Sequence, residues 1–276
     1  MDLSGNIRES IAAGSFYPKN STTLQNQINE FLDNVEKLNL KDIKALICPH
    51  AGYIYSGQVA AYSYKQIIGE QYDSIFIIAP SHSEYFDFVS IYSGKAYRTP
   101  LGQVNVDIER SKTLASYNSN IKMSEYGHRN EHSLEVQLPF LQVIFEDIQI
   151  VPIVMGLQNK SNIEELGNAI GEFFKNENIL IIASTDLSHY HPYDVAASLD
   201  RQVEKMVENF DIEGLQNEFL KENAEMCGGG PVVSSMIAAN MLGAAKSKII
   251  KYQNSGDVSG DKSAVVGYLS AVFYKN

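Results

Sequence analysis

The sequence predicts a three-layer α/β sandwich, in which helices cover both faces of a largely parallel central sheet, with residues 1–276 forming a single domain. Two observations support this prediction. Short runs of Ile, Val and Leu without polar alternation are typical of strands that are buried on both faces. Amphipathic segments separate these runs, and an alternation of strands and helices favours parallel strands joined by crossover helices.

The expected strands are continuous apolar runs, and the last two of them are separated by only a short connection, which favours an antiparallel edge. The strands are predicted at 43–48, 74–79, 88–92, 149–155, 179–183, 248–252 and 265–274.

The expected helices carry apolar residues at helical spacing. Good N-cap residues, Asn20-Ser21-Thr22, precede the first helix, and the last begins at Pro231, a residue favoured in a first helical turn. The helices are predicted at 23–38, 57–68, 107–116, 133–145, 163–175, 195–209 and 231–245.

Composition argues against several classes of protein. The chain carries 33 acidic and 22 basic residues, a net charge of −11, which argues against a nucleic-acid partner because phosphate binding needs clustered Lys and Arg. Its two cysteines are too few for a secreted disulfide scaffold of this size. Met1–Asn6 resemble no signal peptide, and no apolar run is long enough to cross a bilayer. We therefore expect a soluble, cytoplasmic protein without a membrane partner.

Ionisable residues follow three of the predicted strands. His50 follows the strand 43–48, His82 follows 74–79, and Asp186 and His189 follow 179–183. In an open α/β sheet, ligands bind beyond the carboxyl ends of the strands. These side chains are therefore expected to share one rim, where two imidazoles suit a metal ion.

A third metal ligand is expected at Cys227, which precedes Gly228-Gly229-Gly230 and a predicted helix. The N-terminus of a helix lowers the pKa of a thiol, and glycines let the backbone approach a metal or a small molecule. A buried structural cysteine in a tight turn is the equally weighted alternative. Cys48, within an apolar strand, is expected to pack in the core.

Two further segments leave their roles open. In Glu131-His132-Ser133-Leu134-Glu135, the acidic side chains either orient a ligand or catalytic histidine or simply complement a helix dipole. The polar segment 254–261 is expected to be an ordinary turn-rich loop, because it lacks the spacing of a calcium-binding loop.

Several motifs, taken in order along the chain, resemble the Memo protein family. They are Arg8-Glu9-Ser10, Ala13–Pro18, Pro49-His50-Ala51-Gly52-Tyr53, Pro80-Ser81-His82, Glu131–Glu135, Ser184–His189 and Cys227-Gly228. That family is similar to the LigB-like class III extradiol dioxygenases, which use non-haem iron.

The resemblance implies roles for individual residues. His50 and His82 correspond to the metal histidines, His189 to the acid/base histidine, and Cys227 stands where the dioxygenases have a carboxylate. A thiolate there shifts the preference from iron towards copper or zinc. The resemblance also implies a functional association with radical-SAM and AMMECR-type proteins.

Three functions are compatible with these residues. The first is a metal-dependent oxidoreductase, acting on a small aromatic substrate with Asp186 and His189 as the catalytic residues. The second is a binding or scaffold protein that uses the cleft for a small molecule or a peptide. The third is a zinc hydrolase with Asp186 or Glu131 as its base.

Overall fold

The computed structural model describes residues 6–276. The prediction about a signal peptide concerned Met1–Asn6, and Met1–Gly5 lie outside the described residues. The strands are β1 (Ile7–Arg8), β2 (Ile43–Cys48), β3 (Ser74–Pro80), β4 (Val89–Tyr92), β5 (Ala96–Thr99), β6 (Gly102–Val106), β7 (Ile121–Ser124), β8 (Gln149–Met155), β9 (Ile179–Ser184), β10 (His189–His191), β11 (Lys246–Asn254) and β12 (Val265–Tyr274).

The helices are α1 (Ser21–Asp33), α2 (Tyr53–Lys65), α3 (Ile108–Ala115), the 3₁₀ turn η1 (Glu135–Gln137), α4 (Leu138–Ile144), α5 (Lys160–Phe174), α6 (Tyr193–Glu208), α7 (Ile212–Leu220), α8 (Gly229–Met241) and α9 (Ser255–Ser259).

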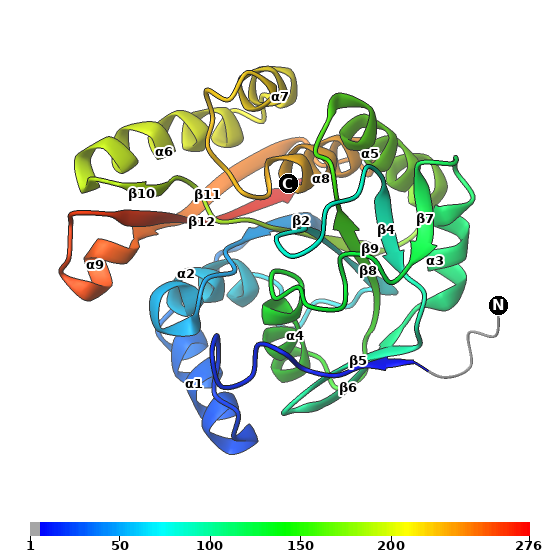
Figure 1. Cartoon of the computed structure of the whole chain (residues 1–276), viewed down its shortest axis with the longest axis horizontal. Coiled ribbons are helices and arrows are strands. Elements are labelled where there is room, and N and C mark those ends of the chain that lie inside the picture. Colours follow the sequence, from blue (N-terminus) through cyan, green and yellow to red (C-terminus); the bar gives the residue numbers. More distant parts are fainter. Residues whose placement is uncertain (1–5) are drawn as a thin grey trace.

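A parallel block forms the centre of the sheet. The strands belong to one 12-stranded sheet, in which β6, β8, β3, β9 and β2 are consecutive and parallel (Figure 1). Antiparallel β12 and β11 follow β2, which confirms the expected antiparallel pair. Because β9 lies between β2 and β3, the carboxyl ends of these three strands meet at one edge of the sheet.

Apolar side chains on the two faces of this block form two core layers. Successive strand residues point to opposite faces, so Ile47 joins one layer while Leu46 and Cys48 join the other. Helices α3, α5, α6, α7 and α8 cover the first face, and α1, α2 and α4 cover the second (Figure 1). The predicted three-layer α/β sandwich is therefore confirmed, as is the core position of Cys48.

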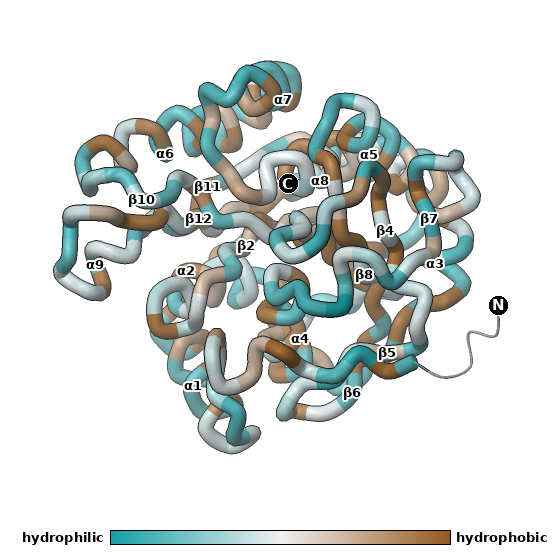
Figure 2. The backbone as a smooth tube through the Cα atoms, viewed as in Figure 1, coloured by the Kyte–Doolittle hydropathy of each residue, from teal (hydrophilic) through white to brown (hydrophobic). Residues whose placement is uncertain are grey.

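The hydropathy of the chain follows these layers. β3 is buried along its whole length, and the central strands form apolar stretches, whereas α1 and α7 alternate between polar and apolar residues (Figure 2). Each fully buried Leu, Ile or Phe side chain contributes about 1.5–3 kcal/mol to folding. The central strands therefore form a rigid base beneath the residues that follow them.

Several predicted elements differ from the structure. The helix predicted at 23–38 spans Ser21–Asp33, and the one predicted at 57–68 spans Tyr53–Lys65. The segment 133–145 begins as the 3₁₀ turn η1, and regular helix starts only at Leu138, because the side chains before it bond to other parts of the fold. The segment 254–261 contains the short helix α9, which a capping box between Asn254 and Asp257 stabilises. Helix α8 begins at Gly229, so Pro231 lies inside its first turn.

Candidate metal centre

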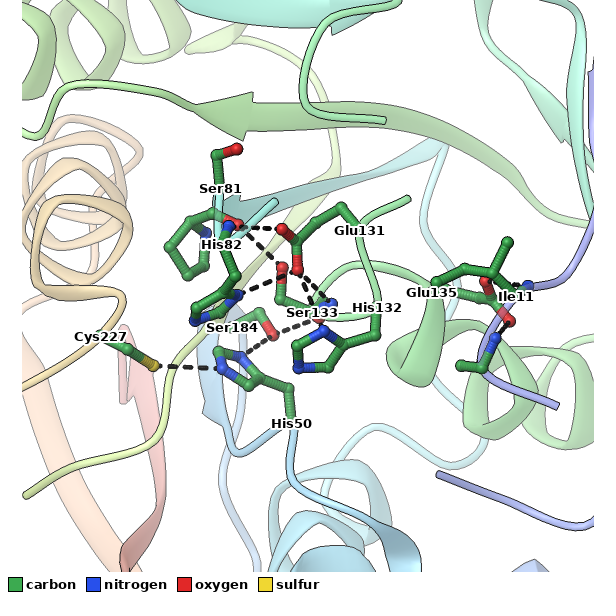
Figure 3. A network of polar contacts seen from close by, with 12 residues as sticks. Ile11, His50, Ser81, His82, Glu131, His132, Ser133, Glu135, Ser184 and Cys227 are labelled. Atoms are coloured by element: carbon green, nitrogen blue, oxygen red, sulfur yellow. Dashed lines mark hydrogen bonds and ion pairs between the residues drawn. The ribbon is translucent and has the colours of Figure 1, made fainter. Parts of the chain in front are cut away.

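Two parallel strands bring His50 and His82 together. Each histidine lies two residues beyond its strand, β2 or β3, and their ring centroids are 5.2 Å apart (Figure 3). Strand β9 separates the two strands and ends at Ser184, between the histidines. The expected convergence of the strand ends is thus present in the structure.

A third imidazole, His132, completes the cluster. It comes from the segment that precedes η1, and its ring centroid lies 5.1 Å from that of His82 and 5.6 Å from that of His50. One ligand atom from each of the three histidines lies within 4.8 Å of the others. The structure therefore contains three histidines that could hold a metal ion. His132 is not among the ligands expected from the sequence, which were His50, His82 and Cys227.

A chain of hydrogen bonds fixes the orientation of the His50 ring. The Ser184 hydroxyl donates its only hydrogen to the carbonyl oxygen of Ser133 (2.6 Å) and accepts a hydrogen bond from the Gln137 amide (2.7 Å). His50 Nδ1, 3.0 Å from the same hydroxyl oxygen, must then be the donor. The lone pair of His50 is therefore on Nε2, the nitrogen that the Cys227 thiol approaches to 3.1 Å.

A single buried carboxylate, that of Glu131, orients the other two rings. Its Oε1 accepts a hydrogen bond from His82 Nδ1 at 3.0 Å and lies 3.3 Å from His132 Nδ1. Its Oε2 accepts the backbone N–H of His82, and the N–H of Ser133 donates to Oε1 at 3.0 Å. Both rings thus direct Nδ1 at Glu131, which leaves Nε2 as the nitrogen for a metal ion; this is the usual role of a carboxylate behind a metal-binding histidine.

The charge states of these groups suit metal binding. Burial lowers the pKa of His50 and of His132, so both imidazoles are neutral at pH 7. Burial alone would raise the pKa of Glu131, but the hydrogen bonds and charge of His82 outweigh it and lower the pKa to about 2. Burial would lower the pKa of His82, but the hydrogen bond to Glu131 and the charge of that carboxylate outweigh it and raise the pKa. Two neutral imidazoles and one fixed negative charge favour a cation between the rings, and a bound cation displaces the proton from His82.

Cys227 lies on the opposite side of His50 from Glu131, with its Sγ 3.1 Å from His50 Nε2 (Figure 3). The backbone N–H of Asp186 donates to this sulfur at 3.2 Å. The expectation of a lowered thiol pKa is wrong in this structure: burial, and then the nearby carboxyl group of Asp186, raise the pKa of Cys227. Desolvation of the thiolate outweighs the effect of the helix N-terminus.

The glycine turn after Cys227 packs against protein rather than leaving a space. A Cβ atom on Gly228 would lie 2.4 Å from the carbonyl oxygen of Ser184, and one on Gly229 would lie 2.2 Å from the Phe219 ring. Glycine at 228 therefore lets the backbone approach the end of β9 closely. This contact sets the position of the neighbouring thiol.

Asp186 and His189 lie beside the cluster. The Oδ1 of Asp186 accepts a hydrogen bond from the backbone N–H of His50 at 2.8 Å, and burial raises the pKa of this carboxyl to about 7. His189 and Cys227 both line a cavity of about 280 Å³, whose apolar wall includes Leu187 and Phe219. Burial lowers the pKa of His189. The cavity gives a small molecule access to this side of the cluster.

The N-terminal segment, residues 8–17, contacts Glu135 and His132. The carboxylate of Glu135 accepts hydrogen bonds from the Arg8 guanidinium, the Tyr17 hydroxyl and two backbone N–H groups. Within the same segment, the Phe16 ring stacks on His132, with centroids 4.2 Å apart. Glu135 therefore faces the N-terminal segment, whereas Glu131 faces the histidines.

The fold and the cluster define the class of the protein: an α/β protein in which histidines beyond β2 and β3, with one from the segment before η1, could hold a metal ion at the edge of the sheet. Comparison with known proteins then gives the family. The sequence pattern of the Memo-like protein family matches residues 8–272. The chain therefore belongs to the Memo-like family, as its motifs predicted.

Curated relatives and a solved structure support this assignment. A MEMO1 family protein of Methanosarcina mazei is 39% identical over 269 residues, covering 96% of this chain and 98% of the relative. One from Aquifex aeolicus is 38% identical over 268 residues, covering 97% and 99%. The crystal structure of an uncharacterised Escherichia coli K12 protein shares the fold, with a TM-score of 0.58 and 13% identity over 84% of this chain and 99% of that one.

Within residues 6–276, no helix has the length and apolar character needed to span a membrane.

Proposed function

We propose that this Memo-like protein is a metal-dependent oxidoreductase that acts on a small aromatic substrate. The observation that carries the proposal is the cluster of three imidazoles, whose ligand atoms lie within 4.8 Å of one another, with Ser184 beside Nδ1 of His50 and Glu131 beside Nδ1 of His82 and of His132. Neutral imidazoles bind iron, copper and zinc, and the set leaves coordination positions open.

Iron is the metal we propose for this function, with copper and zinc as the alternatives. A bound iron ion would supply the redox chemistry that lets an aromatic diol react with dioxygen. His50 and His82 would be two of its ligands, with Cys227 or His132 as the third. The fit rests on the donor set itself, because three oriented imidazoles and one thiol are ligands for all three metals.

His189 and Asp186 would handle protons. His189 lines the cavity next to Cys227 and is neutral at pH 7, because burial lowers its pKa, so it can accept a proton from a substrate hydroxyl. Asp186 has a pKa near 7, which suits a group that takes up and releases protons. The substrate ring would rest against the apolar wall of the cavity.

Three further properties belong to the proposal. The chain would act as one Memo-like domain. It would work in the cytoplasm, where cysteines stay reduced, and both of its cysteines are free thiols. Association with radical-SAM and AMMECR-type proteins remains a prediction from the family resemblance.

The test begins with metal analysis of protein purified without an affinity tag, followed by anaerobic loading with Fe(II) and measurement of oxygen uptake with a panel of catechols. Uptake that requires iron supports the oxidoreductase. Tight zinc with esterase or amidase turnover would instead indicate a hydrolase. Absence of both activities would leave the binding or scaffold function.

One variant tests the proposed role of His189. His189→Ala is expected to abolish oxygen uptake and to leave the metal content nearly unchanged, because an acid/base group is not a ligand. A loss of metal equal to that of His82→Ala would show that His189 is itself a ligand, and its role would have to be redrawn.

A further inference from the structure

Tyr190 has an unusual backbone conformation for its position. Its φ is 63°, in the left-handed region that glycine and asparagine favour and that a bulky aromatic residue rarely adopts. Within residues 6–276, the other non-glycine residues with a positive φ are Asp42, Phe210 and Glu222. Phe210 and Glu222 follow the C-caps of α6 and α7, where a left-handed residue commonly ends a helix, and Asp42 precedes β2. Of these four residues, Tyr190 is the one that lies inside a strand.

The left-handed residue forms a β-bulge where β10 runs along β12 (Figure 1). His189 pairs with Val266 and His191 pairs with Val265, so β10 advances by two residues while β12 advances by one, and Tyr190 is the extra residue. In a regular strand, consecutive residues point to opposite faces of the sheet. The bulge therefore allows two histidines with adjacent partners on β12 to face in the same direction.

Both histidines lie against the segment 222–227, which carries the thiol of the candidate site. His191 Nε2 is 2.9 Å from both carboxylate oxygens of Glu225. His189 lines the cavity of about 280 Å³ together with Glu225 and Cys227. His191 therefore connects β10 to this segment, while His189, on the other side of the bulge, faces the cavity.

The residues on either side of Tyr190 are held by other contacts. The backbone N–H of Ser188 donates to the fully buried carboxylate of Asp200 at 3.0 Å, and the contact with Glu225 holds His191. A strained residue persists where the surrounding structure imposes its conformation. The side chain of Tyr190 is 77% exposed, so its own packing offsets little of the strain. The fixed flanks are therefore what maintains the left-handed backbone.

We propose that Tyr190 is a positioning residue, whose left-handed backbone rather than its ring directs His189 at the cavity. This inference rests on the role in proton transfer proposed above for His189. A group that accepts a proton must lie within hydrogen-bond reach of the atom that carries it. A shift of β10 that moves His189 would therefore reduce turnover and leave the metal in place.

The test uses substitutions that separate the backbone from the ring. Tyr190→Gly and Tyr190→Asn remove the ring and accept a left-handed backbone, whereas Tyr190→Val removes the ring and resists that conformation because its Cβ is branched. In full-length, iron-loaded protein with catechol, the Gly and Asn variants should keep kcat for oxygen uptake within about 3-fold, and the Val variant should lower kcat by about 10- to 100-fold. KM and metal content should stay nearly the same in all three, because the altered step is proton transfer.

The second readout needs no activity. In the metal-free protein, the NMR signals of the His189 ring protons are assigned by their loss in His189→Ala. These signals should coincide in Tyr190→Gly and Tyr190→Asn and be displaced in Tyr190→Val; none of the three has an aromatic ring at this position, so ring currents do not explain a difference. Tyr190→Val should also melt about 2–4 °C below Tyr190→Gly. Asp42→Gly, at a left-handed position that precedes β2, is the control and should change neither kcat nor the His189 signals.

A second variant covers the case in which the fold accommodates valine. Deletion of Tyr190 makes His189 and His191 consecutive in a regular strand, where they must point to opposite faces. The deletion should therefore displace the His189 signals and lower kcat even if Tyr190→Val does not. Circular dichroism checks that each variant is folded.

Several outcomes would overturn the inference. If Tyr190→Phe kept kcat while Tyr190→Gly and Tyr190→Asn lost it, the ring would act rather than the backbone. Unchanged kcat and unchanged His189 signals in both Tyr190→Val and the deletion would show that the bulge does not position the imidazole. Absence of iron-dependent oxygen uptake in the unsubstituted protein would instead contradict the proposed function, and the NMR signals of the metal-free protein would then decide the inference alone.

Discussion

The two sides of the imidazole cluster are built from different interactions. On the carboxylate side, formed by Glu131, His82 and His132, one buried negative charge accepts hydrogen bonds and fixes two rings. On the thiol side, formed by Cys227 and Asp186, the contacts are made by a thiol, a backbone N–H and a carboxyl whose pKa is about 7. Charge-assisted hydrogen bonds are about twice as strong as neutral ones. The difference indicates that the carboxylate side holds the ligands rigidly, while the thiol side, next to the cavity, is the adaptable one.

Removal of His82 should break the site most completely, because that ring belongs to every proposed ligand set. His82→Ala is expected to weaken binding of Fe(II) and Zn(II) by more than about 100-fold. Removal of a direct ligand should cost more affinity than removal of a residue that only orients a ligand. Equilibrium dialysis followed by metal analysis measures the loss. His191→Ala, which removes an imidazole paired with Glu225, is the matched control and should retain its metal. Equal retention by both variants would contradict the assigned site.

Neutralising Glu131 should show how much the carboxylate side depends on charge. Glu131→Gln keeps the shape of the side chain but removes the negative charge beside His82 and His132, so metal affinity should fall by about 10- to 100-fold. Chelator competition measures this effect. Glu109→Gln, a change at an exposed helix position, is the control. An affinity unchanged by Glu131→Gln would mean that packing alone orients the rings.

The fold around His128, a buried residue whose carbonyl oxygen accepts a hydrogen bond from Arg8, should lose stability in acid. His128 accepts a hydrogen bond from Tyr97 at Nδ1 and donates from Nε2 to the carbonyl oxygen of Ser90, and burial lowers its pKa to about 3. The unfolded chain, with a histidine pKa near 6.5, binds the proton first. Stability from this residue is thus fully present above about pH 6.5 and is lost as the pH falls towards 3, by up to about 1.4 kcal/mol per pH unit.

Urea unfolding of metal-free protein at several pH values between 6.5 and 4.5 measures this slope. His128→Gln lacks the titrating group and should show a shallower dependence than the unchanged protein, since the carboxylates are common to both. Parallel profiles would mean that His128 does not contribute to the acid sensitivity.

The smallest effect is expected at Ser184, which holds His50 through a neutral hydrogen bond. Ser184→Ala removes that contact and should lower metal affinity by about 2- to 10-fold, less than Glu131→Gln. Isothermal titration with Zn(II) on both variants checks the order. If Ser184→Ala lowered metal affinity more than Glu131→Gln, the orientation of His50 would matter more than that of His82 and His132.

Much of the site could be predicted because buried strands specify where the chain turns. The apolar runs before His50 and His82 identify the strands, and parallel pairing then brings the two residues together. His132 had no such signal, because it follows no strand and its position depends on contacts of Glu131 and Glu135 with distant parts of the chain. Sequence spacing could not show that these two carboxylates face in different directions.

The secondary structure also has a part that the sequence predicts and a part that it does not. The central strands and most helices were predicted because long apolar patterns determine them. Strands β1, β5, β6, β7 and β10 have only two to five residues each and mixed composition, so their pairing depends on the neighbours that the finished fold supplies. Helix α7 and the five-residue α9 were missed because both are short, although each begins at a good N-cap residue, Asp211 or Asn254.

The sequence separation within the cluster affects how the protein is made. His50 and Cys227, whose side chains touch, are 177 positions apart, and Arg8 reaches Glu135 across 127. Contacts between such distant residues form late in folding, because a long loop must close first. During translation, the thiol donor emerges from the ribosome only after the first two histidines have long been available. The proposed set of donors is therefore complete only after residue 227 has been synthesised, so a metal bound by that whole set would be captured late in synthesis.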